Sequence, residues 1–227
     1  MLLEVIVQSV ADARAAKAGG ADRLEVVREI DRDGLTPSMD LVGQIASETG
    51  LPLRVMVRES EGFGVSGPDE LSRLRRAMNT LARFGVGGAV AGFTANGRLD
   101  LDTLRAVLAE APGLPVTLHR AFDHVRDHLA AIDAISGIAQ VDRILTDGGG
   151  GDWGTRIRRL EQYVARAGSR LRILAGGGVD DAALALLAAS GVVREAHVGR
   201  AARDPQVSAA PVSAARVAQL RGIIDRG

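Results

Sequence analysis

The chain has 227 residues, of which 46% are hydrophobic, and its 28 basic and 28 acidic side chains leave a formal net charge of zero. This length can bury a sizeable core in one domain. Balanced charge without a long run of one sign argues against a nucleic-acid or membrane-surface partner. Because cysteine is absent, disulfides and thiolate metal sites are excluded. Residues 1–8 lack a basic leader and carry Glu4 within an apolar run, so we expect no signal peptide and a cytoplasmic protein.

Eight strand-and-helix units are predicted in succession. The strands are expected at 2–7, 23–27, 53–58, 87–93, 115–118, 142–146, 171–175 and 195–198. Helix signals follow them: Ser9, Asp100 and Asp180 as N-caps, Pro68 at a first turn, and helices over 153–167 and 212–225. Near-equal units without a domain break predict one α/β domain over 1–227, a closed (β/α)8 TIM-like barrel. An open doubly wound sheet is the alternative. The glycine-rich residues 59–67 are expected to form a mobile loop.

Alternation along the predicted strands directs charged side chains into the barrel. Helices cover the outer face of each strand, so that face must be apolar and its neighbours point inward. The inward set is Glu4, Glu25, Arg54, Arg58, His119, Glu195 and His197. Unpaired buried charge is costly, so these groups must pair with each other, with water or with a ligand. They form either an acid–base site, above all at Glu25, Arg58 and His119 near the strand ends, or salt bridges that fill the barrel.

The densest polar cluster, His119-Arg120-Ala121-Phe122-Asp123, directly follows the fifth strand. Residues just past the carboxyl end of a barrel strand form the site in this fold. A histidine exchanges protons near neutral pH, an arginine holds an anion, and Asp123 could orient either one. The alternative is a polar strand end that ties down its own loop. His124 and His128 would lie one turn apart if a helix began near His124, and with His119 they suggest a metal site; solvated histidines are the more common arrangement, and the metal is left unknown.

Glycines end the last two strands where many barrels bind phosphate. Gly176, Gly177 and Gly178 follow the seventh strand, and Gly199 and Arg200 follow the eighth. Bare backbone N–H groups at a helix N-terminus face an anion there, and Arg200 could add a charged contact. We expect a small anionic ligand at these residues, and a side chain at position 177 would occupy the anion's place.

Several motifs together resemble those of the CutC family, known as copper homeostasis proteins. They are residues 3–5, 20–25, 34–38, 57–58, 117–123, 144–146, 174–178 and 195–197, and so run through nearly the whole chain. The resemblance implies a TIM-like barrel, a cytoplasmic and often homodimeric protein, and a link to copper. It also implies a shared cleft of Glu4, Glu25, Arg58, His119, Arg120 and Asp123. Copper binding proposed for the family depends on cysteines, and copper(I) prefers sulfur ligands, so we expect weak copper binding here.

Three functions remain open on the sequence. The first is a CutC-like protein that handles copper directly or through regulation. The second is an isomerase, lyase or aldolase acting on a phosphorylated or carboxylated substrate, with His119 as general acid or base, Glu25 as its partner, and Arg58 and Arg120 as anion clamps. Schiff-base chemistry is excluded, because the only lysine is Lys17 in the first predicted helix. The third is a barrel that has kept its fold and lost its chemistry.

Overall fold

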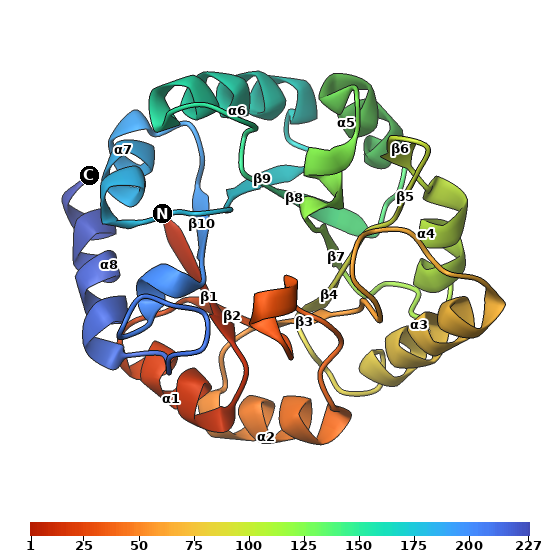
Figure 1. Ribbon diagram of the computed structural model, residues 1–227, viewed down its shortest axis with the longest axis horizontal. Helices are drawn as coiled ribbons and strands as arrows, with labels where there is room; N and C mark the ends of the chain where they lie inside the picture. The colour runs from red at the N-terminus through yellow and green to blue at the C-terminus, as the bar shows by residue number, and fades with distance from the viewer.

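Eight parallel strands close into a barrel in the computed structural model, which describes residues 1–227 (Figure 1). The strand order around the barrel is β1-β10-β9-β8-β7-β4-β3-β2, and β1 pairs with both β2 and β10. The barrel strands are β1 (Leu2–Val7), β2 (Arg23–Val26), β3 (Leu53–Met56), β4 (Gly88–Ala91), β7 (Val116–Leu118), β8 (Val141–Thr146), β9 (Arg172–Ala175) and β10 (Glu195–Val198). Closure confirms the predicted (β/α)8 fold over the open sheet.

Eight helices form a ring around the strands (Figure 1). They are α1 (Val10–Ala18), α2 (Met39–Thr49), α3 (Pro68–Leu81), α4 (Leu101–Leu108), α5 (His128–Ser136), α6 (Trp153–Ala167), α7 (Asp181–Ser190) and α8 (Ala214–Arg226). The predicted caps are confirmed, because the side chains of Ser9, Asp100 and Asp180 each accept a first-turn backbone N–H. None of the helices combines the length and hydropathy that a membrane crossing requires.

The predicted fourth strand and the helix start considered at His124 differ in the structure. The fourth strand ends at Ala91, and a small hairpin of β5 (Thr94–Ala95) and β6 (Arg98–Leu99) follows it. Its turn is Asn-Gly at positions 96 and 97, both with positive φ, as a tight hairpin requires. No helix begins at His124: residues 120–124 form a 3-10 helix, and α5 begins at His128 behind the cap Asp127. His124 and His128 are therefore not successive turns of one helix.

The predicted loop at 59–67 is fastened at both ends. The buried carboxylate of Glu70 accepts the Ser60 hydroxyl at 2.6 Å and the Ser66 backbone N–H at 2.6 Å. Between them, the carbonyl of Phe63 accepts the backbone N–H of Thr94 at 2.8 Å. These bonds hold Phe63 over the end of the barrel.

The main apolar core lies between the strands and the helices, where 52 buried hydrophobic residues form one cluster. Inside the barrel the apolar filling is small: Val27, Met56 and Val90, with Ile6 and Ile30 against them. Charged side chains occupy the remaining interior. Gly88, at φ +157°, makes room for one of them, since a Cβ at this position would collide with the guanidinium of Arg54.

A chain of ion pairs with alternating sign runs through the barrel from its amino end. Arg54 and Arg143 both contact Asp142, at 2.7 and 3.0 Å. Arg143 and Arg23 then share Glu195, at 3.1 and 2.6 Å. Arg23 also pairs with Glu4, which lies below the carboxyl-end pocket. The deep interior is thus filled by salt bridges. This was one of the two arrangements expected for the inward charges, the other being an acid–base site.

Removing one charge from this chain should be costly. We expect Arg23→Met to lower the free energy of unfolding by about 3–5 kcal/mol, because Glu4 and Glu195 would remain buried with fewer partners. Arg14→Met is the matched control: it breaks the exposed 2.9 Å pair with Glu48 and should cost about 1 kcal/mol or less. Urea unfolding of the three proteins measures both. Equal losses in the two variants would contradict this account.

Candidate functional site

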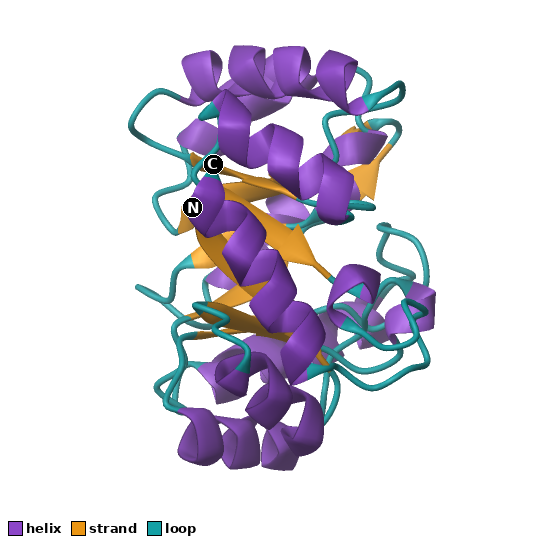
Figure 2. Ribbon diagram, turned by 90° about the vertical axis from the view of Figure 1, so that its left-hand side faces the viewer, coloured by secondary structure: helices purple, strands orange, loops and turns teal.

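A pocket of about 700 Å³ opens at the carboxyl ends of the strands. Loops and short helices gather beyond one end of the barrel, as the side view shows (Figure 2). The pocket wall includes eight of the predicted site residues: Glu25, Arg58, His119, Arg120, Gly177, Gly178, Gly199 and Arg200. His197 also lines it, whereas Glu4, Asp123 and Gly176 lie outside the wall. The structure therefore brings most of the predicted site together.

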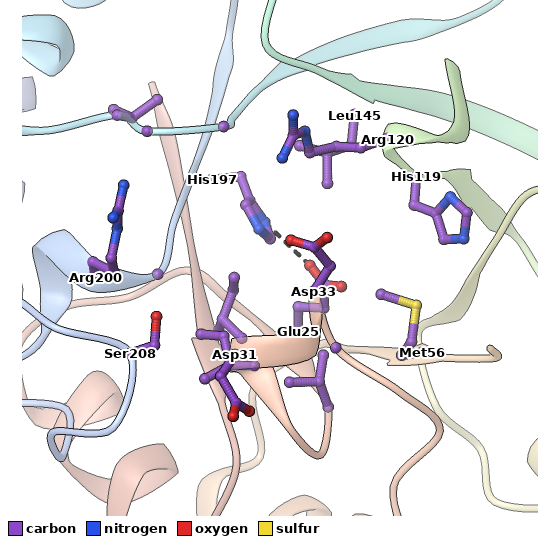
Figure 3. A pocket seen from close by; sticks show the side chains of 18 of the residues that line it. Glu25, Asp31, Asp33, Met56, His119, Arg120, Leu145, His197, Arg200 and Ser208 are labelled. Carbon is purple, nitrogen blue, oxygen red and sulfur yellow. Dashed lines mark ion pairs between the residues drawn. The ribbon is translucent and has the colours of Figure 1, made fainter. Parts of the chain in front are cut away.

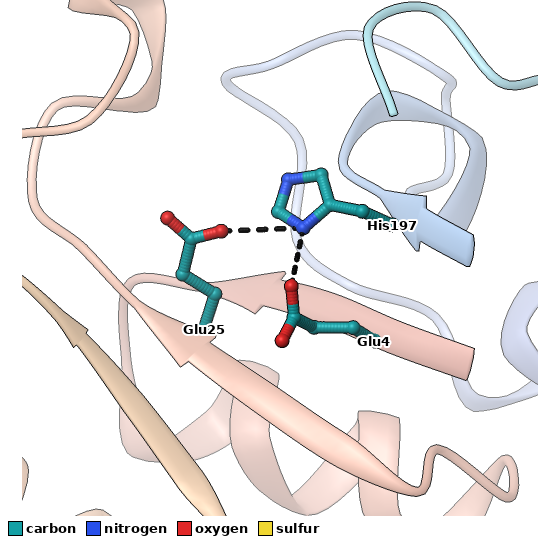
Figure 4. A group of neighbouring side chains, drawn as sticks. All are labelled: Glu4, Glu25 and His197. Atoms are coloured by element: carbon teal, nitrogen blue, oxygen red, sulfur yellow. Dashed lines mark hydrogen bonds and ion pairs between the residues drawn. The ribbon is translucent and has the colours of Figure 1, made fainter. Parts of the chain in front are cut away.

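Glu4, Glu25 and His197 meet one another (Figure 4), with Glu25 and His197 on the pocket wall and Glu4 beneath them. The Nδ1 atom of His197 lies 2.7 Å from Oε1 of Glu4 and 3.2 Å from Oε2 of Glu25. All three side chains are buried, and the second oxygen of Glu4 accepts from Arg23. Strand register explains the contact, since Glu4 is the β-ladder partner of both His197 and Arg23. Two carboxylates thus share the proton on one imidazole nitrogen.

The two carboxylates differ in protonation because their surroundings differ. Burial would raise the pKa of Glu4, but the hydrogen bond from His197 and the charge of Arg23 outweigh it and lower this pKa to about 2. Burial raises the pKa of Glu25 to about 7, and the negative charge of Glu4 adds to this while His197 offsets part of it. Burial alone would lower the pKa of His197, but Glu25 and Glu4 raise it. Because Glu25 and His197 interact, they titrate together, and the carboxyl of Glu25 can exchange a proton near neutral pH.

His119 lies at the end of β7 and remains neutral. Burial lowers the pKa of His119 to about 3, and the positive charge of Arg58 contributes. Its Nδ1 accepts the backbone N–H of Ala121 at 3.1 Å, which places the ring proton on Nε2. Phe63 packs against the ring, with centroids 5.1 Å apart. A neutral ring with this tautomer suits hydrogen-bond donation better than the predicted general-base role.

The two arginines expected to clamp an anion are both engaged by the protein. Arg58 donates to the backbone carbonyls of Arg32, Asp33 and Ser60, so it fastens the loop after β2. Arg120 contacts Asp123 and Asp147, each at 3.0 Å.

Asp123 lies behind Arg120 and orients it. It also accepts the Thr146 hydroxyl and the Asp147 backbone N–H. Burial raises the pKa of Asp123. Arg120 and Asp123 therefore fasten the loop after their own strand, which was the alternative to a ligand-binding role.

The glycine ends form one side of the pocket, which carries the arginine Arg200 and the carboxylate of Asp180. Gly177 and Gly178 have φ of +76° and +88°, a conformation that favours glycine. We expected a side chain at position 177 to occupy the place of an anion, but packing already excludes one. A Cβ there would lie 2.5 Å from the Cβ of Asp147. Arg200 is exposed and is the one arginine on the wall whose side chain makes no hydrogen bond or ion pair.

The histidine metal site that the sequence left as the less common alternative does not form. His119 and His124 contact Phe63, with ring centroids at 5.1 and 4.7 Å, while His128 packs against Phe122 and Tyr163. The one group with metal-ligand spacing is Glu4, Glu25 and His197, whose ligand atoms lie within 4.8 Å of one another.

Two contributions to the site were missed from the sequence. Arg23 has the same strand parity as Glu25, so alternation could have placed it in the barrel. Phe63 carried no such signal, because it lies in a loop whose position depends on the distant Glu70.

Comparison with known proteins assigns the family. Residues 1–202 match the CutC family. The chain belongs to the CutC family. A CutC-family protein of Caulobacter vibrioides is 39% identical over 198 residues, which cover 87% of this chain and 80% of that protein. A human copper homeostasis protein cutC homolog is 31% identical over 205 residues, covering 89% and 75%. A crystal structure of CutC from Streptococcus agalactiae has the same fold, with a TM-score of 0.80 at 24% identity over 88% of this chain and 98% of that chain.

The CutC family is linked by name to copper homeostasis, but this barrel does not fit copper(I). Its ligand-spaced group offers carboxylate and imidazole atoms, whereas copper(I) prefers thiolate and thioether sulfur. There is no cysteine, and Met56 is the only sulfur on the pocket wall. The Glu4 oxygen that does not contact His197 accepts a hydrogen bond from Arg23.

The raised pKa of Glu25 predicts that replacing its carboxyl with a neutral amide stabilises the protein, by an amount that depends on pH. Because the pKa of Glu25 in the folded state lies above the usual glutamate value of about 4.5, the folded state binds more protons between about pH 4.5 and 7, and wild-type stability falls as pH rises through that window. Glu25→Gln removes this fall. We expect the variant to be more stable by on the order of 2 kcal/mol at pH 9, with the gain vanishing below pH 4.5.

Urea unfolding at several pH values measures this difference. Glu161→Gln is the matched control, because Glu161 is exposed on α6, and it should change stability little at any pH. A Glu25→Gln effect that is the same at pH 4.5 and pH 9 would refute the assignment.

Proposed function

We propose that this CutC-family barrel binds a small anionic organic molecule in its mouth pocket and exchanges a proton with it through Glu25. The carrying observation is the Glu25–His197–Glu4 group: a buried carboxyl, 2% exposed, whose pKa is raised to about 7 by burial on the wall of a pocket. A general acid or base works best when its pKa lies near the operating pH. This supports a reaction of the isomerase or lyase type.

His197 and Glu4 position the reacting carboxyl. Glu4 is held ionised by Arg23 and His197, so the shared Nδ1 proton is fixed between two oxygens (Figure 4). The imidazole of His197 lies between Glu25 and the ionised Glu4, so it separates the two carboxyl groups while Glu25 gains or loses a proton. Lys17, the only lysine, lies on α1 outside the pocket, which argues against a Schiff base.

The anion is held, in this proposal, at the open side near Arg200. Gly177 and Gly178 present backbone without side chains, and the ten-residue helix α7 follows them behind its cap Asp180, whose carboxylate accepts one first-turn N–H. Arg200 has a guanidinium free for a charge-assisted contact. Arg58 and Arg120 contribute positive potential, but their donors are already shared with carbonyls and carboxylates.

The link to copper homeostasis would then be indirect, through the small molecule rather than through a held metal. We place the protein in the cytoplasm, since a chain without cysteine suits a reducing compartment. The family resemblance supports a homodimer. Neither nucleic acid nor membrane is a partner in this proposal.

Inorganic phosphate should raise the melting temperature at constant ionic strength, because a ligand that binds only the folded state adds RT ln(1 + [L]/Kd), about 2.7 kcal/mol at a hundredfold excess over Kd. Arg200→Ala should reduce the rise. The matched control is Arg83→Ala, another exposed arginine, which lies just after α3 and outside the pocket. No rise with phosphate beyond that with chloride would refute the anion site.

Copper(I) should bind weakly. Titration against a chelating competitor should leave no copper on the protein at nanomolar free metal, because no thiolate is present. A stoichiometric complex that survives this competition would show that copper is handled directly.

A further inference from the structure

His119 carries a buried donor that the protein itself does not use. Its Nε2 has no hydrogen-bond partner, and the side chain is only 2% exposed, yet it lines the mouth pocket. Thr117 and Arg203 also have buried polar atoms without partners, but neither residue lines the pocket. A buried donor left unpaired costs about 1–3 kcal/mol, so its presence at a pocket wall points to an acceptor on a ligand.

The ring of His119 is fixed as a donor. The N–H of Ala121 occupies Nδ1, and a Cβ at Gly92 would lie 3.0 Å from the same atom, so the backbone packs closely behind the ring. Phe63 covers the ring from the loop at 59–67, which Glu70 fastens. The rigid orientation is the kind that an oxyanion-stabilising donor requires, since it needs no rearrangement when charge develops.

We infer that the pocket enolises a carbonyl compound, with the Nε2–H of His119 donating to the carbonyl oxygen while Glu25 takes the proton from the neighbouring carbon. This rests on the proposed function and names its substrate class. Glu25 accepts the proton, the C–H electron pair forms a carbon–carbon double bond, and the carbonyl π pair moves to the oxygen. When the carbon that loses the proton carries a hydroxyl, the intermediate is an enediolate. The hydroxyl proton then passes to the former carbonyl oxygen and Glu25 returns its proton to the former carbonyl carbon, which completes an isomerisation without oxidant, reductant or co-reactant.

The arrangement of the pocket limits the substrate further. Arg200 and His119 lie on opposite sides of it, with Glu25 and His197 between them (Figure 3). An anionic group at Arg200 would leave the carbonyl part of the molecule over Glu25 and beside His119. The substrate class is therefore a small carbonyl compound with a remote phosphate or carboxylate.

Oxalate, a planar mimic of an enediolate, tests the inference, with succinate as the flexible dianion for comparison. By calorimetry at neutral pH we expect oxalate to bind the full-length wild-type protein at least tenfold more tightly than succinate. His119→Phe, which keeps a ring but removes the donor, should abolish that preference, whereas His119→Gln, which keeps a donor, should restore part of it. Phosphate should still raise the melting temperature of all three proteins.

The inference is overturned if the wild type does not prefer oxalate, or if His119→Phe keeps the preference. If phosphate still raises the melting temperature in that case, the proposed anion site stands. Loss of both oxalate and phosphate binding in the wild type would refute the proposed function itself. Should His119→Phe fail to fold, the Nε2–H proton signal of wild-type His119 decides: it should move downfield when oxalate binds, and an unmoved signal would overturn the inference.

Discussion

The site depends on the carboxylate of Glu4, which lies between Arg23 on one side and His197 on the other. Arg23 stabilises the negative charge of Glu4, and that charge in turn raises the pKa values of His197 and Glu25 above it. The ion pairs beneath, through Glu195, Arg143 and Asp142, fill a barrel that has little apolar interior. The charge of Glu4, which these ion pairs hold in place, therefore adds to burial, the main cause of the raised pKa of Glu25.

The sequence predicted the barrel and most of its wall because both follow from local rules. Strand alternation alone places Glu4, Glu25, Arg58, His119 and His197 inside, and capping side chains mark the helices. It could not assign roles to those side chains, because partners come from distant strands: Glu4 meets His197 across 193 positions.

The same limit explains the errors at the carboxyl end. Arg58 was expected to hold a ligand and instead holds three backbone carbonyls. The helix start considered at His124 lies four residues later, at His128. The hairpin after β4 had an Asn-Gly signal, but its strands of two residues each are too short for periodicity to reveal. Loop positions here depend on long-range hydrogen bonds rather than on local pattern.

Membership of the CutC family and the chemistry of this pocket point in different directions. The family name concerns copper, yet this chain offers a hard, ion-paired donor set and no thiolate. A pocket with a proton-exchanging carboxyl, a fixed neutral donor and a free arginine is suited to an organic anion. The two are compatible if the protein affects copper through the molecule that it binds.

The central claim is that Glu25 exchanges its proton near neutral pH because its carboxyl is buried on the pocket wall, with the negative charge of Glu4 adding to the effect. Carbon-13 NMR of glutamate-labelled protein, followed from pH 4 to 9 and assigned with Glu25→Gln, measures this directly. The account predicts one carboxyl that titrates near pH 7 and disappears from the spectrum of the variant, while Glu4 stays ionised throughout. A Glu25 carboxyl that titrates with the exposed glutamates, below pH 5, would contradict the account.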